Sequence, residues 1–301
     1  TVYNSILETI GETPLVRLNH IPAKGTEVYV KIESHNPGGS IKDRAVLSMI
    51  DDAVAKGRLS AGGTIIEPTS GNTGIAIALI SAVRGYKAVM TMPDTMSKER
   101  QAYMKAYGAE LVLIPGKLGM QGAVDKAKEL QASTPNSVIL DQFGNPANAA
   151  IHRTTTGPEI LAALPDVAYV VAGFGTGGTI TGIARALQDA GSDAVAVGVE
   201  PAESPLVGAG RAGPHRIQGI GANFLPGNLD RSVVKTIAPV KGDDAVAMTR
   251  RLAREEGIFA GISAGANVWE AVELAEAHPG RKVVAILPDG GDKYVSMGIY
   301  D

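Results

Sequence analysis

Short apolar runs rich in β-branched residues alternate with segments of helical periodicity along nearly the whole chain. Strands are expected at Glu27–Ile32, Thr64–Glu67, Lys87–Met92, Glu110–Ile114, Ser137–Leu140, Tyr169–Ala172, Ala194–Glu200, Val233–Ile237 and Val283–Leu287. Helices are expected between them, at Ile41–Lys56, Thr73–Arg84, Lys98–Tyr107, Met120–Ala132, Pro158–Ala163, Thr179–Ala190, Asp243–Glu256 and Ala264–Ala277. This alternation is typical of βαβ units, which build parallel sheets covered by helices. The sequence therefore predicts an α/β protein.

Chain length and one turn-rich stretch indicate how this α/β protein is divided. At about 150 residues per domain, 301 residues correspond to two domains or to one large domain. The turn Phe143-Gly144-Asn145-Pro146 is the expected boundary, which gives an N-terminal domain over residues 1–145 and a C-terminal domain over residues 146–301. Ser40 and Ser97 are expected to be helix N-caps, and Gly85 a helix C-cap.

Composition excludes several classes of protein. With no cysteine, the chain cannot form disulfides, zinc–thiolate sites or iron–sulfur clusters, and it has no cysteine nucleophile. A formal net charge of -3 gives no basic footprint for nucleic acid or for an anionic membrane. The five histidines lack metal-ligand spacing, so no metal site is expected. Because no apolar run reaches the ~18 residues of a membrane span and Thr1–Ser5 does not resemble a signal peptide, we expect a cytoplasmic protein.

Glycine is in excess, at 37 of 301 residues, and part of this excess follows the expected strand Tyr169–Ala172. Gly173, Gly175 and Gly178 satisfy G-x-G-x-x-G, and Glu200 ends the next strand, as in an NAD-dependent dehydrogenase. The same loop also suits a compact phosphate monoester, because Thr176 and Thr179 add hydroxyl donors to the helix N-terminus. A simple tight turn is the third interpretation.

A second polar loop, Glu67-Pro-Thr-Ser-Gly-Asn-Thr-Gly74, lies between a strand and a helix and suits a carboxylate. Two such loops in one α/β chain suggest a ligand with two anionic ends. Lys42 lies in the first turn of a helix, where the helix dipole and Arg44 should lower its pKa, as a Schiff-base lysine requires. A solvated lysine beside a cap is the alternative. Ser263 could equally be an N-cap, and the Asp289–Lys293 turn could be a polar turn or a pocket wall.

Taken together, six ordered motifs resemble those of the cysteine synthase (O-acetylserine sulfhydrylase) family of fold-type II pyridoxal-phosphate enzymes. The resemblance spans residues 4–298. It implies a tryptophan synthase β-like fold with two domains, each a mostly parallel twisted sheet flanked by helices, and an active site in the cleft between them. It also implies that residues at about 13–35 can cross into the sheet of the other domain. The motifs are Asn36-Pro-Gly-Gly-Ser-Ile-Lys-Asp-Arg44, Glu67–Gly74, Gln142-Phe-Gly-Asn-Pro-Ala-Asn148, Gly173–Thr179, Gly213-Pro-His-Arg-Ile-Gln-Gly-Ile-Gly221 and Gly261-Ile-Ser263.

The resemblance also implies a role for each site residue. Lys42 would form the internal aldimine with pyridoxal 5′-phosphate and act as general base, Asn72 would contact the 3′-oxygen of the ring, and Ser263 its nitrogen. The implied phosphate-binding residues are Gly175, Thr176, Gly177, Gly178 and Thr179. The implied substrate-binding residues are Thr69, Ser70, Gly71, Thr73 and Gln142 around the carboxylate, and Gly219, Ile220, Gly221 and Ala222 beyond it.

The implied reaction converts O-acetyl-L-serine and sulfide to L-cysteine and acetate through an α-aminoacrylate intermediate. Cystathionine β-synthase and serine/threonine dehydratase are alternatives within the same fold, and a dehydrogenase is a remote one. The family resemblance further implies a homodimer and a possible complex with the C-terminal tail of serine acetyltransferase at Pro214–Arg216. Three positions depart from the family pattern, namely Asn223, Ala264 and the Asp289–Lys293 turn, and Asn223 puts the substrate preference in doubt.

Overall fold

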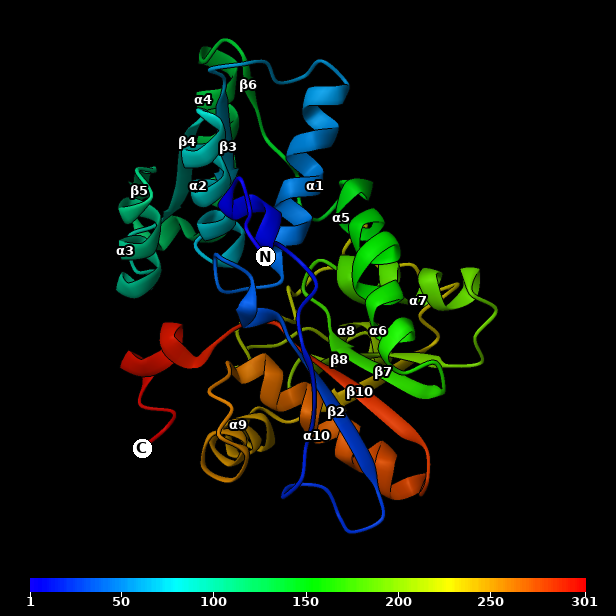
Figure 1. Cartoon of the computed structure of the whole chain (residues 1–301). Helices are drawn as coiled ribbons and strands as arrows, with labels where there is room; N and C mark the ends of the chain where they lie inside the picture. The colour runs from blue at the N-terminus through cyan, green and yellow to red at the C-terminus, as the bar shows by residue number, and fades with distance from the viewer.

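The computed structural model describes residues 1–301 and contains two β-sheets, which Figure 1 shows in the upper and lower halves of the molecule. The six-stranded sheet has parallel neighbours except at β1, which pairs antiparallel with β2. In spatial order its strands are β1 (Leu15–Arg17), β2 (Glu27–Ile32), β10 (Lys282–Leu287), β7 (Val167–Gly173), β8 (Val195–Pro201) and β9 (Thr236–Val240). The four-stranded sheet is parallel throughout, in the order β5 (Glu110–Ile114), β4 (Lys87–Pro93), β3 (Thr64–Pro68) and β6 (Ser137–Val138). The expected α/β fold with two mostly parallel sheets is confirmed.

Helices surround both sheets. Those near the four-stranded sheet are α1 (Lys42–Ala55), α2 (Asn72–Arg84), α3 (Lys98–Ala106) and α4 (Gly119–Ser133). Those near the six-stranded sheet are α5 (Pro146–Ile151), the π-helix η4 (His152–Thr156), α6 (Gly157–Ala163), α7 (Gly178–Asp189), α8 (Leu206–Ala209), α9 (Gly242–Glu256) and α10 (Ile262–Ala277). Short 3₁₀ helices are η1 (Ile6–Thr9), η2 (Glu33–His35), η3 (Gly116–Leu118) and η5 (Gly291–Met297). None of the helices combines the length and the apolar character needed to cross a bilayer.

The core is divided by the six-stranded sheet, because successive side chains of a strand point to opposite faces. Val283 and Ala285 of β10 pack in the cluster that includes α9 and α10, whereas Val284 and Ile286 pack in the cluster that includes α6 and α7. A separate cluster fills the space around the four-stranded sheet. Each sheet therefore has its own hydrophobic packing, with one cluster on each face of the six-stranded sheet and one around the four-stranded sheet.

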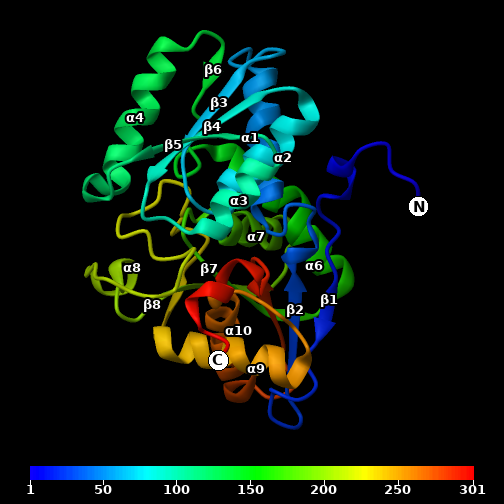
Figure 2. The same ribbon diagram turned by 90° about the vertical axis from the view of Figure 1, so that its left-hand side faces the viewer.

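Chain connectivity links the two halves. β1 and β2 precede the four-stranded sheet in sequence but pair with β10 in the six-stranded sheet, and Figure 2 shows them running beside α9 and α10. Helix α5 begins at Pro146, directly after the expected boundary turn. The boundary at residue 145 itself stays a prediction.

Several expected elements differ from those observed. β9 lies three residues further along the chain than expected and includes Pro239. Proline is tolerated there because β9 is an edge strand of the sheet, where the N–H that proline lacks disrupts no ladder of hydrogen bonds. β1, α5, η4 and α8 were not predicted, since each is short or lacks clear periodicity. Ser97 caps α3 and Gly85 ends α2 in the left-handed conformation, as expected. Ser40 is not the N-cap of α1; Ile41 is, and Ser40 Oγ instead accepts the Lys42 N–H at 3.1 Å.

Candidate active site

One pocket between the two sheets gathers most of the residues that sequence reasoning assigned to a cofactor. Lys42 and Asn72 enter it from α1 and α2, and the remaining lining comes from the six-stranded side. Of the expected residues the pocket is lined by Lys42, Asn72, Gly175, Thr176, Gly177, Thr179, Gly219, Ile220 and Ser263. The expected residues outside this lining are Thr69, Ser70, Gly71, Thr73, Gln142, Gly178, Gly221 and Ala222.

Lys42 is the first residue of α1, and the loop before it is fixed to the end of β10. The Ile41 N–H donates to the Pro288 carbonyl at 2.9 Å, and Ser40 forms a bridge with Asp289. Burial of the amino group lowers the pKa of Lys42 to about 8. Arg44 was expected to contribute, but its guanidinium faces the other way, into ion pairs with Glu33 and Glu159. Desolvation is therefore the cause of the lowered pKa.

The loop from Gly175 to Thr179 presents backbone donors at the N-terminus of α7. Gly177 is the N-cap, with φ of 83°, a left-handed conformation that glycine adopts without strain. The N–H groups of Gly175, Thr176, Gly177 and Thr179 have no acceptor within the protein. A Cβ on Gly175 would lie 2.5 Å from the Gly219 carbonyl, so this backbone must be glycine. Such a loop binds an anion.

The second anion-binding loop opens α2. Its N-cap is Gly71, which offers no side-chain cap, and the N–H groups of Asn72 and Thr73 have no acceptor within the protein. Thr73 Oγ1 donates to Gln142 Oε1 at 2.6 Å, which brings two expected substrate residues together. The backbone of Gln142 is held in turn, because its carbonyl accepts from Asn148 and Asn228, each at 2.9 Å.

Ser263 lies in the first turn of α10, behind the N-cap Gly261, so it is not the cap that was one of its two interpretations. The residue is buried and lines the pocket. A Cβ on Gly219 would lie 3.9 Å from Ser263 Oγ, which shows how closely the 219–220 loop approaches it. A neutral hydroxyl thus faces the pocket beside α10.

A buried polar network around Asn72 was not predicted. Asn72 Nδ2 donates to Asp289 Oδ2 at 2.8 Å, and Asn72 Oδ1 accepts from Lys293 Nζ at 2.9 Å. Tyr294 OH also donates to Asp289 Oδ2, at 2.6 Å. Burial raises the pKa of Asp289 and lowers that of Lys293. Of the two interpretations of the Asp289–Lys293 turn, the structure therefore supports the pocket wall, since Asp289 lines the pocket.

Gly221 and Ala222 line a small adjoining cavity with Asn223 and Ser204. The two cavities share Phe174 and Gly175. Asn223 has φ of 63°, and Ser204 Oγ donates to its Oδ1 at 2.6 Å. Asn223, where the sequence departs from the family pattern, thus has a left-handed backbone conformation and a side chain held by a hydrogen bond, in the loop beside the pocket.

Glu200 does not have the role that a dinucleotide-binding site would require of it. Its carboxylate accepts the backbone N–H groups of Val207 and Gly208 at 2.9 and 2.8 Å, and the side chain is buried. It therefore holds the start of α8 and is not available to a ribose hydroxyl.

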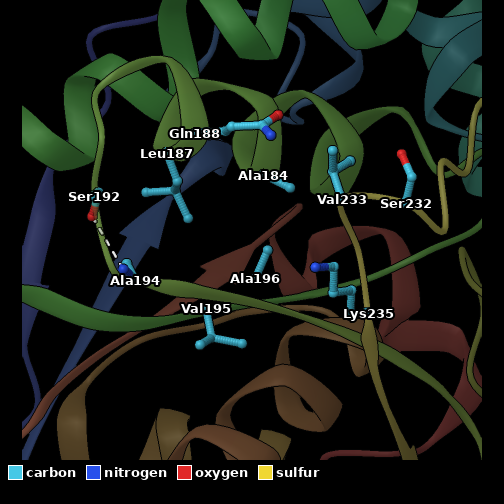
Figure 3. Close-up of a pocket in the computed structure, with 10 residues that line it drawn as sticks. All are labelled: Ala184, Leu187, Gln188, Ser192, Ala194, Val195, Ala196, Ser232, Val233 and Lys235. Carbon is cyan, nitrogen blue, oxygen red and sulfur yellow. Dashed lines mark hydrogen bonds between the residues drawn. The ribbon is translucent and has the colours of Figure 1, made fainter.

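A further cavity lies away from the site, between α7 and β8 (Figure 3). Leu187 from α7, Ala196 from β8 and Val233 point into its apolar part, and Lys235 is its only charged residue. It lacks the convergent polar groups found around Lys42.

The chain matches the family described as pyridoxal-phosphate dependent enzymes over residues 6–289, and it belongs to that family. It is 47% identical over 301 residues to a cysteine synthase of Staphylococcus aureus, covering 99% of this chain and 97% of the relative. It is also 49% identical over 303 residues to an O-ureido-L-serine synthase of Streptomyces lavendulae, covering 100% and 93%. The solved cysteine synthase of Entamoeba histolytica superposes with a TM-score of 0.95 at 41% identity, covering 100% of this chain and 91% of that one. The expected enzyme family and fold-type II architecture are thereby confirmed.

Proposed function

We propose that this enzyme converts O-acetyl-L-serine and sulfide to L-cysteine and acetate with pyridoxal 5′-phosphate as cofactor. The observation that carries the proposal is Lys42, which lies in a pocket flanked by two helix N-termini with free backbone donors, at Gly175–Thr179 and at Asn72. A cofactor phosphate and a substrate carboxylate are the two anions that these loops match. The cysteine synthase relatives support the same reaction.

The residues present fit pyridoxal phosphate at each of its polar groups. The Gly175–Thr179 loop would hold the phosphate, Ser263 the ring nitrogen, Asn72 the 3′-oxygen, and Lys42 the aldehyde carbon. One N–H of the Asn72 amide is used by Asp289, and the other has no protein partner. When bound, pyridoxal phosphate supplies an electron sink that stabilises negative charge at the substrate Cα.

Substrate binding is proposed for the α2 loop, with Thr69, Ser70, Gly71, Thr73 and Gln142 around the carboxylate. The Thr73–Gln142 hydrogen bond fixes this pair before substrate arrives, which lowers the entropy cost of orientation. Gly219, Ile220, Gly221 and Ala222 would line the acyl end.

Lys42 Nζ is proposed to remove the proton from the substrate Cα and to return it after sulfide has added at Cβ. A pKa of about 8 leaves a useful fraction of neutral amine near pH 7, as a general base requires. Acetate leaves from Cβ between these two proton transfers. The buried walls on both sides of Lys42 exclude water from the reacting carbon.

The second candidate function is the addition of a different nucleophile to the same serine-derived substrate. The O-ureido-L-serine synthase relative is as similar to this chain as the cysteine synthase is, so the fold and identity do not separate the two products. Cystathionine β-synthase and a serine/threonine dehydratase remain alternatives of the same class.

Product analysis tests the proposal. Purified enzyme with pyridoxal phosphate is incubated with O-acetyl-L-serine and either sulfide or hydroxyurea, and separately with L-serine and homocysteine. Cysteine formed at least tenfold faster than O-ureido-L-serine or cystathionine supports the proposal, whereas a faster reaction with another nucleophile reassigns the product. Pyruvate from serine alone would indicate a dehydratase.

Two partners are proposed with this function. The exposed apolar side chains Val2, Tyr3 and Ile6 support a homodimer, which sedimentation of the purified enzyme tests. The active-site cleft, together with the Pro214–Arg216 segment, is proposed to receive the C-terminal tail of serine acetyltransferase. A tail peptide ending in isoleucine that fails to compete with O-acetyl-L-serine would count against that complex.

A further inference from the structure

Glu67 is a buried acidic residue that none of the roles proposed above uses. It lies in β3, just before the loop that opens α2, and it is only 2% exposed. Glutamate is seldom buried to this extent unless its carboxylate is paired or hydrogen-bonded. Burial raises the pKa of Glu67 to about 7, and backbone N–H groups of the segment after β6 oppose this shift by stabilising the charged form. The contacts of the carboxylate therefore indicate what the residue does.

The carboxylate of Glu67 binds the backbone of the segment that leads from β6 to α5 (Figure 1). Its Oε2 accepts the Leu140 N–H at 2.8 Å, and its Oε1 accepts the Gln142 N–H in a longer hydrogen bond of 3.5 Å. Asp141, between them, has φ of 55°. A left-handed residue of this kind lets neighbouring N–H groups converge on one anion. Glu67 thus holds residues 140–142 beyond the end of the β3–β6 pairing.

The carbonyl groups of the same segment are held by asparagine side chains. The Leu140 carbonyl accepts from Asn145 Nδ2 at 2.8 Å, and the Gln142 carbonyl accepts from two further asparagines, each at 2.9 Å. Hydrogen bonds on both the N–H and the carbonyl side leave this backbone little freedom. The place from which the Gln142 side chain starts is therefore fixed by Glu67 together with these asparagines.

The amide of Gln142 is oriented by Thr73. Thr73 Oγ1 donates to Gln142 Oε1 at 2.6 Å. Since a primary amide accepts at its oxygen and donates from its nitrogen, this contact leaves the two N–H bonds of Gln142 Nε2 for another acceptor. The backbone N–H groups of Asn72 and Thr73 are free in the same way, at the N-terminus of α2. Donors from two segments therefore suit the two oxygens of one carboxylate.

These two segments are joined at two points. Glu67 and Thr73 belong to the continuous stretch from β3 into α2, and both bind the 140–142 segment, one through its backbone and one through the Gln142 side chain. A double connection fixes the spacing of the two sets of donors before a ligand arrives. Groups behind a site that hold its binding groups in place lower the cost of binding.

We infer that Glu67 is a positioning residue for the substrate carboxylate: by holding the 140–142 backbone, it places the Gln142 amide opposite the N-terminus of α2. The inference rests on the proposed function, since it assumes that the substrate carboxylate binds at the α2 loop. Glu67 does not touch the substrate and acts through Gln142. Its loss should therefore reduce affinity for the carboxylate group specifically.

Two ligands that differ only at this group provide the test. L-Alanine has no leaving group at Cβ, and L-alaninamide carries a neutral carboxamide in place of the carboxylate. Each is titrated into the holoenzyme at pH 8, above the pKa of Glu67, and binding is followed by the change in the visible absorption of the cofactor. Concentrations are counted as neutral amine, because the amino groups of the two ligands titrate differently.

Glu67→Gln keeps the shape of the side chain but replaces one acceptor oxygen with an NH₂ group, which cannot accept from a backbone N–H. One N–H of the 140–142 segment then lacks its acceptor, and the segment has to move. Glu67→Gln is expected to weaken the binding of L-alanine roughly tenfold and that of L-alaninamide less than twofold.

Glu200→Gln is the matched control. Glu200 is also buried and also accepts two backbone N–H groups, at 2.9 and 2.8 Å, but it holds α8 instead of the 140–142 segment. This variant should bind both ligands as the wild type does. Glu67→Asp is a second variant, because its shorter carboxylate cannot reach both N–H groups. If Glu67→Gln does not fold, Glu67→Asp gives the same comparison, with L-alanine again weakened more than L-alaninamide.

The outcomes separate the inference from the proposed function. Equal weakening of both ligands in the Glu67 variant, or no weakening of either, would overturn the inference, and so would the same selective loss in Glu200→Gln. A wild type that binds L-alanine no better than L-alaninamide would overturn carboxylate binding at the α2 loop and the inference with it. A selective loss in the Glu67 variant, with no cysteine formed by the wild type, would instead contradict the proposed reaction alone.

Discussion

The amide of Asn72 and the carboxylate of Asp289 lie 2.8 Å apart across the cleft, although 217 positions separate them in the chain. Asn72 opens α2, whereas Asp289 follows β10 of the six-stranded sheet. Lys293 binds the other end of the same amide. Together these two contacts fix the orientation of a side chain that is proposed to touch the cofactor.

Asp289→Ala is expected to lower kcat roughly tenfold or more, because Asn72 and Tyr294 lose a shared buried acceptor. Asp289→Asn, which keeps one oxygen, should lose less. Steady-state kinetics with O-acetyl-L-serine measures both. The control is Asp292→Ala on the exposed side of the same turn, and equal losses in Asp289→Ala and Asp292→Ala would contradict the assignment.

Lys42→Met should make the cofactor-free protein more stable near neutral pH. The folded-state pKa of Lys42 is lowered from 10.5 to about 8, so between these values the unfolded chain binds a proton that the folded chain does not. Stability of the wild type therefore rises with pH through this window, and the lysine is least favourable below pH 8. The difference in unfolding free energy between Lys42→Met and wild type is expected to be roughly 2–3 kcal/mol larger at pH 7 than above pH 10.

Urea unfolding of the two cofactor-free proteins across this pH range measures the difference. Other titrating groups are common to both proteins and cancel. A difference that does not change with pH would show that the Lys42 amino group is not desolvated in the folded state.

Arg44→Met should destabilise the protein by about 3–5 kcal/mol, because it leaves a buried carboxylate without its partner. Arg44 Nε lies 2.6 Å from Glu33 Oε1, and both side chains are almost fully buried. Removing the exposed Arg153–Asp189 pair with Arg153→Ala should cost far less stability. Urea unfolding of both variants measures the two losses of stability. Similar losses in Arg44→Met and Arg153→Ala would contradict the conclusion that burial makes the Arg44 pair more important.

Substitution of Asn223 tests the part of the site that is proposed to bind the acyl group of the substrate. Asn223→Gly keeps the left-handed backbone but removes the acceptor of the Ser204 hydroxyl, so the loop beside the pocket should loosen. We expect KM for O-acetyl-L-serine to rise about threefold to tenfold, with a smaller change in kcat. Ser204→Ala removes the same bond and also the acceptor of the Gly213 N–H, so KM should rise at least as much. If KM stays unchanged in both variants, the hydrogen bond between Ser204 and Asn223 does not influence substrate binding.

The sequence predicted the parts of the site that lie in local motifs. Each glycine-rich loop follows a strand and opens a helix, so periodicity and turn residues were enough to locate Lys42, Asn72 and the Gly175–Thr179 loop. The contacts of Asp289 and Glu67 were beyond reach, because they join segments far apart in sequence. The pairing of β2 with β10 is non-local in the same way. The cause of the lowered pKa of Lys42 was also wrong, since neighbours in sequence do not reveal that Arg44 turns away.

The most direct test of the account is the visible absorption spectrum of the purified enzyme with pyridoxal phosphate, before and after O-acetyl-L-serine and then sulfide. We predict a visible band that depends on Lys42, is replaced by a new band on addition of O-acetyl-L-serine, and returns when sulfide releases cysteine; Lys42→Ala should lack the whole sequence. A wild type that stays colourless, or a band that O-acetyl-L-serine does not change, would contradict the proposed function.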